Sequence, residues 1–190
     1  GGVGKDLDYF RFSADKPEVV KAFEKAFGPT PREVEVFLPY ATVDLNFPCW
    51  REERGKSTGL KHRCDGQVMV LWLGLDNRYH TEPKPCPYVG IAEADLPKVR
   101  CTNVGKLHVI IPALVRAGFV GYVTMRTGSI NDILNILGTL RETARIRGSE
   151  DLAGVAFMLR RVMGEVPFVN DKGVRSRVKK WLVQLEPSQR

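Results

Sequence analysis

The stretch "FVGYVTMRTGSINDILNILGTLRETARIRG", residues 119–148, decides the fold because a strand pattern in it is followed directly by a helix pattern. Residues 119–127 are rich in β-branched and aromatic side chains, which is typical of a strand. Residues 129–148 carry apolar side chains at helical spacing, and Ser129 and Asp132 form a capping pair at their start. Gly148 ends this helix, whose apolar face is expected to comprise Ile130, Ile133, Leu134, Leu137 and Ala144.

Apolar segments on both sides of this stretch predict further strands. Upstream, "KLHVIIP" at residues 106–112 is a short apolar run typical of a strand. Downstream, "NDKG" at residues 170–173 separates two apolar and basic runs, and a turn of this composition indicates a β-hairpin. The second run also has a helical pattern, but the turn and the β-branched residues favour strands. The helical alternative would place on one face Val174, Val178, Trp181, Leu182 and Leu185.

The N-terminal part contains a β-α-β pattern. "LDYFRF" at residues 7–12 and "REVEVFLPY" at residues 32–40 alternate as strands do, and residues 15–28 between them form a helix pattern with Asp15 as its cap. Together with the later elements this predicts an α+β fold of the split βαβ, ferredoxin-like kind. We expect a four-stranded antiparallel sheet with two helices on one face and a cysteine-bearing insertion. The other face would be free to contact a partner.

The distribution of helix and strand patterns along the chain predicts a core domain and an insertion. Residues 1–39 and 106–190 form the core α+β domain, and residues 40–105 form an inserted, loop-rich subdomain in which only "QVMVLWLGL", residues 67–75, has a clear strand pattern. The opening "GGVGKD", residues 1–6, resembles part of a phosphate-binding loop. It lacks the Ser or Thr that should follow Lys5 and has no strand before it, so a flexible terminus is the better interpretation.

Composition predicts a globular protein with an acidic partner. The apolar runs are far shorter than the roughly 20 residues of a membrane helix, and no export signal opens the chain, so we expect a cytoplasmic protein without a membrane partner. The net charge is +7, and residues 141–190 hold eleven Lys or Arg against six Asp or Glu. This imbalance favours nucleic acid or an acidic protein surface as partner, with a solvated basic surface as the alternative.

Four cysteines lie between residues 49 and 101, together with His62. Disulfides would require an oxidising compartment, and a catalytic thiol would rest on the His62 and Cys64 pair alone. A structural zinc ion fits better because thiolates and imidazole are its usual ligands and a loop-rich insertion needs internal support. Unligated buried cysteines remain an alternative. The candidate ligands are His62, Cys64, Cys86 and Cys101, with Cys49 as an alternative ligand in a four-cysteine site.

Several segments resemble one family of phage proteins, the recombination directionality factors of large serine integrases. The similar segments are "RCDG" at residues 63–66, "CPY" at residues 86–88, the stretch that begins at Cys101, and the closing basic hairpin. The similarity spans residues 8–187. Two positions depart from the family pattern, since Leu60 and Lys84 stand where the family typically has cysteines.

The resemblance implies a non-catalytic accessory factor that binds a DNA-bound serine integrase and switches recombination towards excision. It also implies that Cys64, Cys86 and Cys101 are what remains of the family's metal site, with His62 as the fourth ligand of a structural zinc ion. The basic hairpin would contact the integrase or neighbouring DNA, with Trp181 as an anchor if it is exposed. Its basic residues are Arg175, Arg177, Lys179 and Lys180.

Two other functional classes compete with this interpretation. A split βαβ domain with a cysteine-bearing insertion also resembles the RNA-binding subunits of CRISPR effector complexes, where Tyr9, Phe10 and Phe12 would be the only aromatic cluster able to stack on bases. An enzyme would rest on His62 and Cys64 alone, because no paired acids or metalloprotease spacing occur. We therefore expect the protein not to be an enzyme.

Overall fold

The structure, a computed structural model, describes residues 7–55, 57, 59–91, 100–169 and 174–188. Residues 1–6, interpreted above as a flexible terminus, and the predicted hairpin turn at residues 170–173 lie outside the described residues. The fold is α+β, with antiparallel sheets and four helices in the described part of the chain. The helices are α1 (Pro17–Phe27), α2 (Val43–Asn46), α3 (Pro112–Arg116) and α4 (Ile130–Arg147). The strands are β1 (Glu33–Phe37), β2 (Cys49–Gly55), β3 (Gly59–Cys64), β4 (Val68–Leu73), β5 (Tyr79–His80), β6 (Lys84–Pro85), β7 (Thr102–Val109), β8 (Val123–Thr127), β9 (Ala156–Val169) and β10 (Arg175–Pro187).

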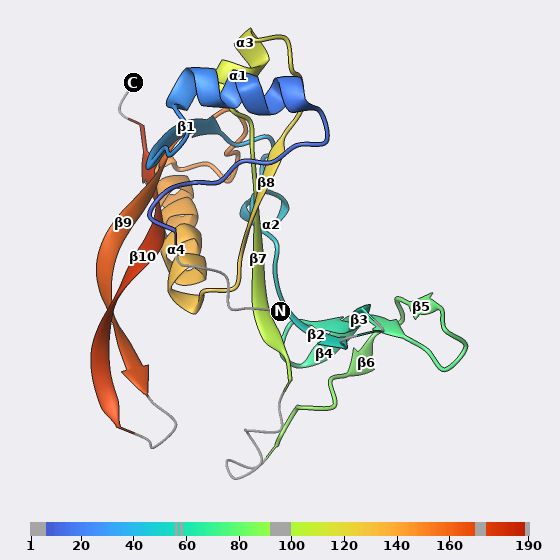
Figure 1. Cartoon of the computed structure of the whole chain (residues 1–190). Helices are drawn as coiled ribbons and strands as arrows, with labels where there is room; N and C mark the ends of the chain where they lie inside the picture. The colour runs from blue at the N-terminus through green and yellow to red at the C-terminus, as the bar shows by residue number, and fades with distance from the viewer. Residues whose placement is uncertain (1–6, 56, 58, 92–99, 170–173, 189–190) are drawn as a thin grey trace.

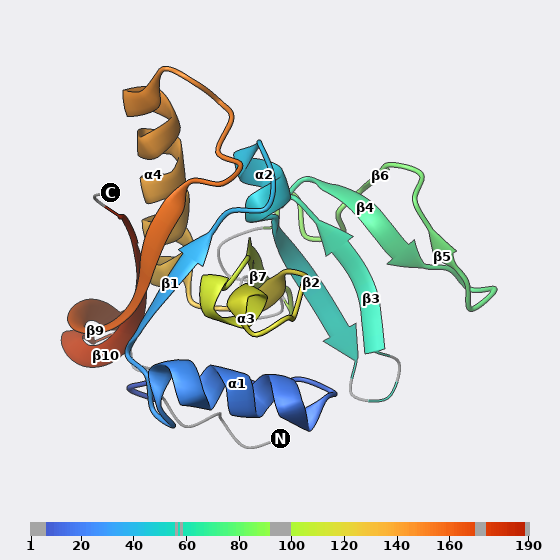
Figure 2. The same cartoon turned by 90° about the horizontal axis from the view of Figure 1, so that it is seen from above.

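The strands form two sheets (Figure 1). The first has the order β1-β9-β10, and its long β9–β10 hairpin confirms the strand interpretation of the C-terminal runs. The second has the order β5-β4-β3-β2-β7-β8, with β6 paired to β4. An isolated bridge between Phe37 and Ile110 connects the two sheets. Figure 2 shows β2, β3 and β4 extending to one side of α3, with β1, β9 and β10 on the other side.

Helix α4 packs against β10, and its beginning is held by polar contacts. The Ser129 hydroxyl accepts a hydrogen bond from the backbone N–H of Asp132, as the capping pair predicted. The buried Asp132 carboxylate then accepts two more hydrogen bonds, from the Val183 backbone N–H at 3.0 Å and from the Thr127 hydroxyl at 2.9 Å. Asp132 thus connects α4 to both sheets.

The buried face of α4 differs from the predicted one. Ile133 and Ala144 are buried as expected, but Ile130 and Leu134 are exposed. The buried set is Asp132, Ile133, Ile136, Leu140, Thr143 and Ala144. The helix is therefore rotated by part of a turn relative to the expectation, because its polar residues Asp132 and Thr143 lie on the core side.

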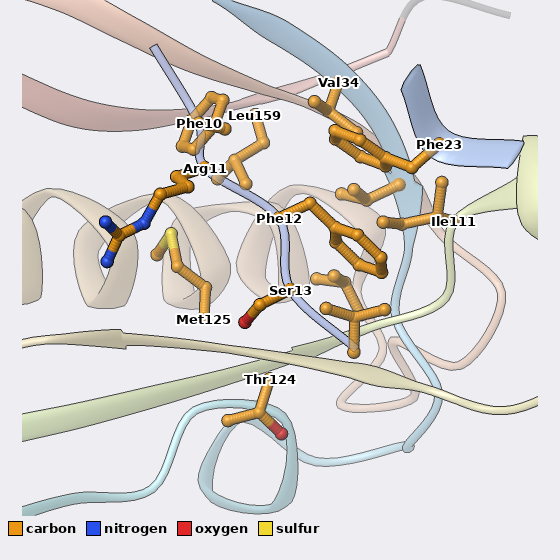
Figure 3. A pocket seen from close by; sticks show the side chains of 13 residues that line it. Phe10, Arg11, Phe12, Ser13, Phe23, Val34, Ile111, Thr124, Met125 and Leu159 are labelled. Atoms are coloured by element: carbon orange, nitrogen blue, oxygen red, sulfur yellow. The ribbon is translucent and has the colours of Figure 1, made fainter. Parts of the chain in front are cut away.

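The N-terminal segment corrects one prediction, because residues 7–12 do not form a strand. Phe10 donates a backbone hydrogen bond to the Pro31 carbonyl, and the Phe12 ring stacks on Phe23 of α1 at 4.5 Å between ring centroids. Figure 3 shows this segment crossing a small apolar cavity of about 130 Å³, lined among others by Val34 and Leu159. The aromatic residues of this segment therefore help to close the core.

The ferredoxin-like arrangement is not confirmed, since one expected strand is absent and the strands divide between two sheets. Helix α1 begins after Lys16 without a side-chain cap, so Asp15 is not its cap. Residues 40–105 contain more strand than expected, because β2 and β3 join the predicted β4. Whether this segment is a separate subdomain stays a prediction.

Candidate metal centre

A tight turn between β3 and β4 places the first two candidate ligands. The Asp65 carboxylate accepts hydrogen bonds from the backbone N–H groups of Gln67 at 2.7 Å and Val68 at 2.8 Å. Gly66 has a φ of 110°, a conformation that favours glycine. The Gln67 carbonyl then accepts a hydrogen bond from the backbone N–H of Cys86 at 2.8 Å, which draws the Cys86 segment to the same turn.

Four predicted ligands meet at this point. His62 and Cys64 lie two residues apart on β3 and therefore share one face of the strand. Cys86 directly follows β6, and Cys101 directly precedes β7. The nearest ligand atoms of the four side chains all lie within 4.8 Å of one another. The Nε2 atom of His62 is 3.3 Å from the Cys101 sulfur and 3.9 Å from the Cys86 sulfur.

The donor set and its dimensions suit a metal ion. A tetrahedral zinc site with bonds of about 2.0–2.3 Å has ligand atoms roughly 3.4–3.8 Å apart, so the observed cluster needs only a small contraction. The cluster also has little apolar support. Its buried apolar residues are Cys64, Met69 and Cys86, with Trp72 and Tyr88 partly buried against them. A bound ion would therefore supply cohesion that this region otherwise lacks.

A buried carboxylate lies behind the histidine. Glu53 of β2 is the cross-strand partner of His62, and its Oε2 atom lies 3.7 Å from His62 Nδ1. The same carboxylate accepts hydrogen bonds from the Tyr88 hydroxyl at 2.7 Å and from Lys61 Nζ at 3.1 Å. The register of β2 and β3 shifts after this pair, so that Lys61 is an extra residue in β3 whose ammonium reaches Glu53. This arrangement directs Nε2 of His62 towards the thiols.

The electrostatics of the cluster follow from its burial. Burial raises the pKa of the Cys64 thiol and raises the pKa of Cys101 to about 12, while it lowers the pKa of His62. Burial alone would raise the pKa of Glu53. The hydrogen bonds from Tyr88 and Lys61 outweigh this effect, so the pKa of Glu53 lies below its usual value. The metal-free thiols of Cys64 and Cys101 are therefore protonated at neutral pH, and metal binding must release their protons.

Cys49 does not belong to this cluster. Its sulfur donates a hydrogen bond to the Phe47 carbonyl at 3.4 Å, and its side chain packs against the main core. The structure therefore does not bring together the alternative four-cysteine site. All four cysteines are free thiols, so the disulfide alternative has no support either.

The two positions that depart from the family pattern have other packing roles. Leu60 is buried in β3. Lys84 lies in β6, and its ammonium sits 4.7 Å from the centre of the Trp72 ring. Neither residue type can replace a thiolate ligand, so His62 is the fourth member of the cluster.

The predicted basic residues lie on β10, far along the chain from the cysteines. Arg175, Arg177 and Lys179 alternate along the strand and share one face, and Lys180 is on the other. All four are exposed, and Arg177 lies 4.0 Å from Glu165 of β9. Trp181 is half-buried, with the Arg32 guanidinium 5.0 Å from its ring centre. The tryptophan is therefore only partly available as an anchor.

The sequence did not reveal the residues behind the ligands. Glu53 reaches His62 through the pairing of β2 with β3, Tyr88 reaches Glu53 through a hydrogen bond, and Lys61 directly precedes His62 in the chain. Tyr88 follows Cys86 by two residues in "CPY", and this proximity was the one available signal for it.

Comparison with known proteins identifies one family. The profile of a family described as Gp3-like, recombination directionality factor-like, matches residues 1–184. No curated protein and no solved structure gives a significant match to the chain. None of the helices in the described part of the chain has the length and apolar character needed to cross a membrane. Because the family match covers nearly the whole sequence, the chain belongs to the Gp3-like family of recombination directionality factor-like proteins.

Proposed function

We propose that this protein is a non-catalytic accessory factor that binds a serine integrase on its attachment-site DNA and switches recombination towards excision. The observation that carries this proposal is the family match over residues 1–184. An accessory factor of this kind acts by differential binding. It must bind the excision-competent arrangement of the integrase more tightly than the other, by about 5 kcal/mol for a nearly complete switch.

The exposed basic side of β10 is the proposed contact with the integrase or with neighbouring DNA. Arg175, Arg177 and Lys179 share one strand face, so their charges act on the same partner surface. Such a surface attracts acidic partners, and its contribution falls as salt screens the charges.

We propose zinc as the structural cofactor of the His62, Cys64, Cys86 and Cys101 cluster. Three sulfur donors and one imidazole nitrogen are a common structural zinc set, and all four positions would be filled by protein. A closed site of this kind supports the fold and leaves no position for a reacting water. Metal analysis of the purified protein tests this directly, since one equivalent of zinc is expected and less than about half an equivalent would contradict it.

A non-catalytic role agrees with the chemistry of the cluster. A nucleophilic cysteine needs a lowered pKa and access to substrate, whereas Cys64 is buried and burial raises its pKa. The RNA-binding alternative is not favoured, because it required an exposed aromatic strand at residues 7–12. That segment is not a strand, and Phe12 stacks on Phe23.

The test is a recombination assay with the cognate integrase. The purified protein should stimulate recombination between the two prophage attachment sites and inhibit it between the phage and bacterial sites. The hairpin contact is tested with the triple variant R175Q/R177Q/K179Q. Its matched control removes the same charge from three exposed lysines near α1, K16Q/K21Q/K25Q. A wild-type protein without effect on either reaction would refute the proposed function, and equal activity of both triple variants would refute the hairpin contact.

A further inference from the structure

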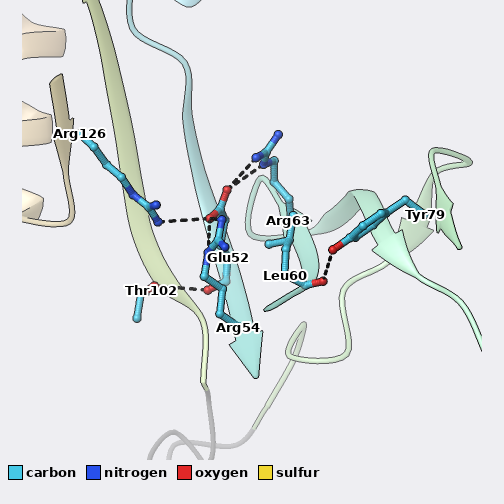
Figure 4. A network of polar contacts seen from close by, with 7 residues as sticks. All are labelled: Glu52, Arg54, Leu60, Arg63, Tyr79, Thr102 and Arg126. Atoms are coloured by element: carbon cyan, nitrogen blue, oxygen red, sulfur yellow. Dashed lines mark hydrogen bonds and ion pairs between the residues drawn. The ribbon is translucent and has the colours of Figure 1, made fainter. Parts of the chain in front are cut away.

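A second charged cluster lies on β2, one residue before Glu53. The side chain of Glu52 is fully buried, and its carboxylate accepts hydrogen bonds from three arginines (Figure 4). Arg63 donates through Nε at 3.0 Å and Nη2 at 2.8 Å, and Arg54 donates through Nε at 3.0 Å and Nη2 at 2.9 Å. Arg126 reaches the same carboxylate through Nη2 at 3.5 Å. We call Arg54, Arg63 and Arg126 the arginine cluster.

The arginine cluster occupies one face of the second sheet, opposite to the candidate metal ligands. Adjacent residues of a strand point to opposite faces, so Glu52 points away from the side on which Glu53 meets His62. Glu52 pairs across the sheet with Arg63 on β3 and with Thr102 on β7. Arg126 on β8 pairs with Lys106, which lies on the same side of β7 as Thr102. Lys106 therefore adds a further positive charge beside the cluster.

The single carboxylate does not neutralise these arginines. Three guanidinium groups and one carboxylate leave a net charge of +2, and Glu52 is the only acidic ion partner of the cluster in the part of the chain that the structure describes. The side chains of Arg54, Arg63 and Arg126 are 45%, 23% and 51% exposed. The buried acid thus lies beneath a partly exposed layer of excess positive charge.

The arginines also retain hydrogen-bonding capacity. Each guanidinium has five N–H donors. Glu52 accepts from two nitrogens of Arg54, two of Arg63 and one of Arg126, so most of the donors are not used by the carboxylate. Figure 4 shows Arg63 and Arg126 reaching Glu52 from different sides. Because the carboxylate holds the guanidinium groups near one another, an incoming anion would meet donors whose side-chain entropy is already reduced.

We propose that the arginine cluster binds a backbone phosphate of the DNA on which the integrase is seated, an inference that rests on the proposed function. Donors that converge from three strands suit a tetrahedral oxyanion, which has several oxygens to share among them. The cluster supplies a position-fixing contact without sequence information, distinct from the contact of the β10 residues.

The test measures binding of the full-length protein to a short labelled duplex by fluorescence anisotropy over a series of salt concentrations. Arg126→Gln is the first variant, because Arg126 is half exposed and makes the longest contact with Glu52. The loss of one phosphate contact should reduce the slope of log affinity against log salt concentration by about 0.9. This corresponds to roughly fivefold weaker binding near 0.15 M salt and roughly fifteenfold weaker binding near 0.05 M. R54Q/R126Q should lower the slope further, and Arg126→Lys should restore part of it.

The control is Arg147→Gln, which removes the same charge from an exposed position at the end of α4. An attachment-site duplex and an unrelated duplex should respond alike, because the contact is to the backbone. Circular dichroism of each variant checks that it is folded. Titration with inorganic phosphate shows whether the cluster binds free phosphate rather than a phosphate of the DNA backbone.

Three results would overturn the inference. The first is wild-type protein that does not bind the duplex, or variants whose affinity and slope equal those of wild type. The second is a cluster that binds inorganic phosphate while its variants bind the duplex normally. The third is variants that bind the duplex normally but no longer retain the integrase, which would identify an acidic protein partner. In each case excision activity of the wild-type protein would leave the proposed function standing, so the two failures are distinguishable.

Discussion

Replacing Glu53 by glutamine is expected to weaken metal binding without removing a ligand. The substitution keeps the size of the side chain but removes the charge that faces His62 Nδ1. It also replaces one of the two oxygens that accept hydrogen bonds from the Tyr88 hydroxyl and Lys61 Nζ. One of these donors would then face an amide N–H group. The imidazole loses both its electrostatic partner and part of the support that orients it.

The size of the effect follows from the geometry. Partners behind a metal-binding histidine typically contribute about 10- to 100-fold in metal affinity, which is about 1.4 to 2.7 kcal/mol. The distance of 3.7 Å between Glu53 Oε2 and His62 Nδ1 is longer than a hydrogen bond, and burial lowers the pKa of His62, so the carboxylate charge acts on a neutral imidazole without a direct hydrogen bond. We therefore expect the lower end of the range, about tenfold.

The assay is competition for zinc between the protein and a chromophoric chelator at neutral pH. Glu165→Gln is the matched control, because it removes the same charge from an exposed position on β9. Tyr88→Phe provides a milder variant that removes only the hydroxyl that binds Glu53, and it should shift the affinity in the same direction. Zinc affinities of Glu53→Gln and Tyr88→Phe within twofold of wild type would refute the assignment of Glu53 as the residue that orients His62.

Three further predictions concern stability. Glu52→Gln should lower the free energy of unfolding by about 2–4 kcal/mol at neutral pH, because it leaves three arginines without their carboxylate. Burial raises the pKa of Glu52, but the hydrogen bonds from Arg63 and Arg54 outweigh it and hold the pKa below its usual value. The stabilisation by ionised Glu52 is therefore present above about pH 4.3 and is lost as the pH falls through the lowered pKa. In urea unfolding, the difference in free energy of unfolding between wild type and Glu52→Gln should accordingly become smaller in acid. Zinc chelation should abolish amide hydrogen-exchange protection in β3 and β4 and leave α4 protected, and equal loss in both regions would contradict a local role. Asp132→Ala should lower the free energy of unfolding by about 1–3 kcal/mol, because it leaves the buried Val183 N–H without its acceptor. Ser129→Ala removes only the helix cap and should cost less, about 1 kcal/mol. Thermal unfolding that ranks the two variants in the reverse order would contradict this.

The elements that could be predicted from the sequence are those whose signals are local. Helix α4 has its cap at Ser129 and its left-handed Gly148 in the expected places, and the β9–β10 hairpin follows from its turn composition. The segment at residues 7–12 has an equally clear alternation but is not a strand. Its Phe12 stacks on Phe23, and this tertiary contact outweighs the local β-propensity.

Strand β2 could not be predicted because its buried side chains are charged. Its sequence is "CWREERG", and the buried pair in it is Glu52 and Glu53. A pattern search expects apolar residues at buried positions. Here the partners that make burial tolerable, such as Arg126 and Tyr88, lie 74 and 35 residues away in the chain. Such pairs are formed by the fold and leave no periodic trace in the sequence.

The same strand connects the two candidate sites. Glu53 on one face of β2 contacts His62 of the metal cluster, and Glu52 on the other face holds the arginine cluster. The irregular spacing of the ligands means that they converge only when β3 has paired with β4 and the chain has returned to β7. Metal binding therefore favours the paired sheet as a whole, including the register that places Arg63 opposite Glu52. We expect loss of the metal to weaken the arginine cluster, because Arg63 lies between the ligands His62 and Cys64 on β3 and both clusters depend on the pairing of β3 with β2.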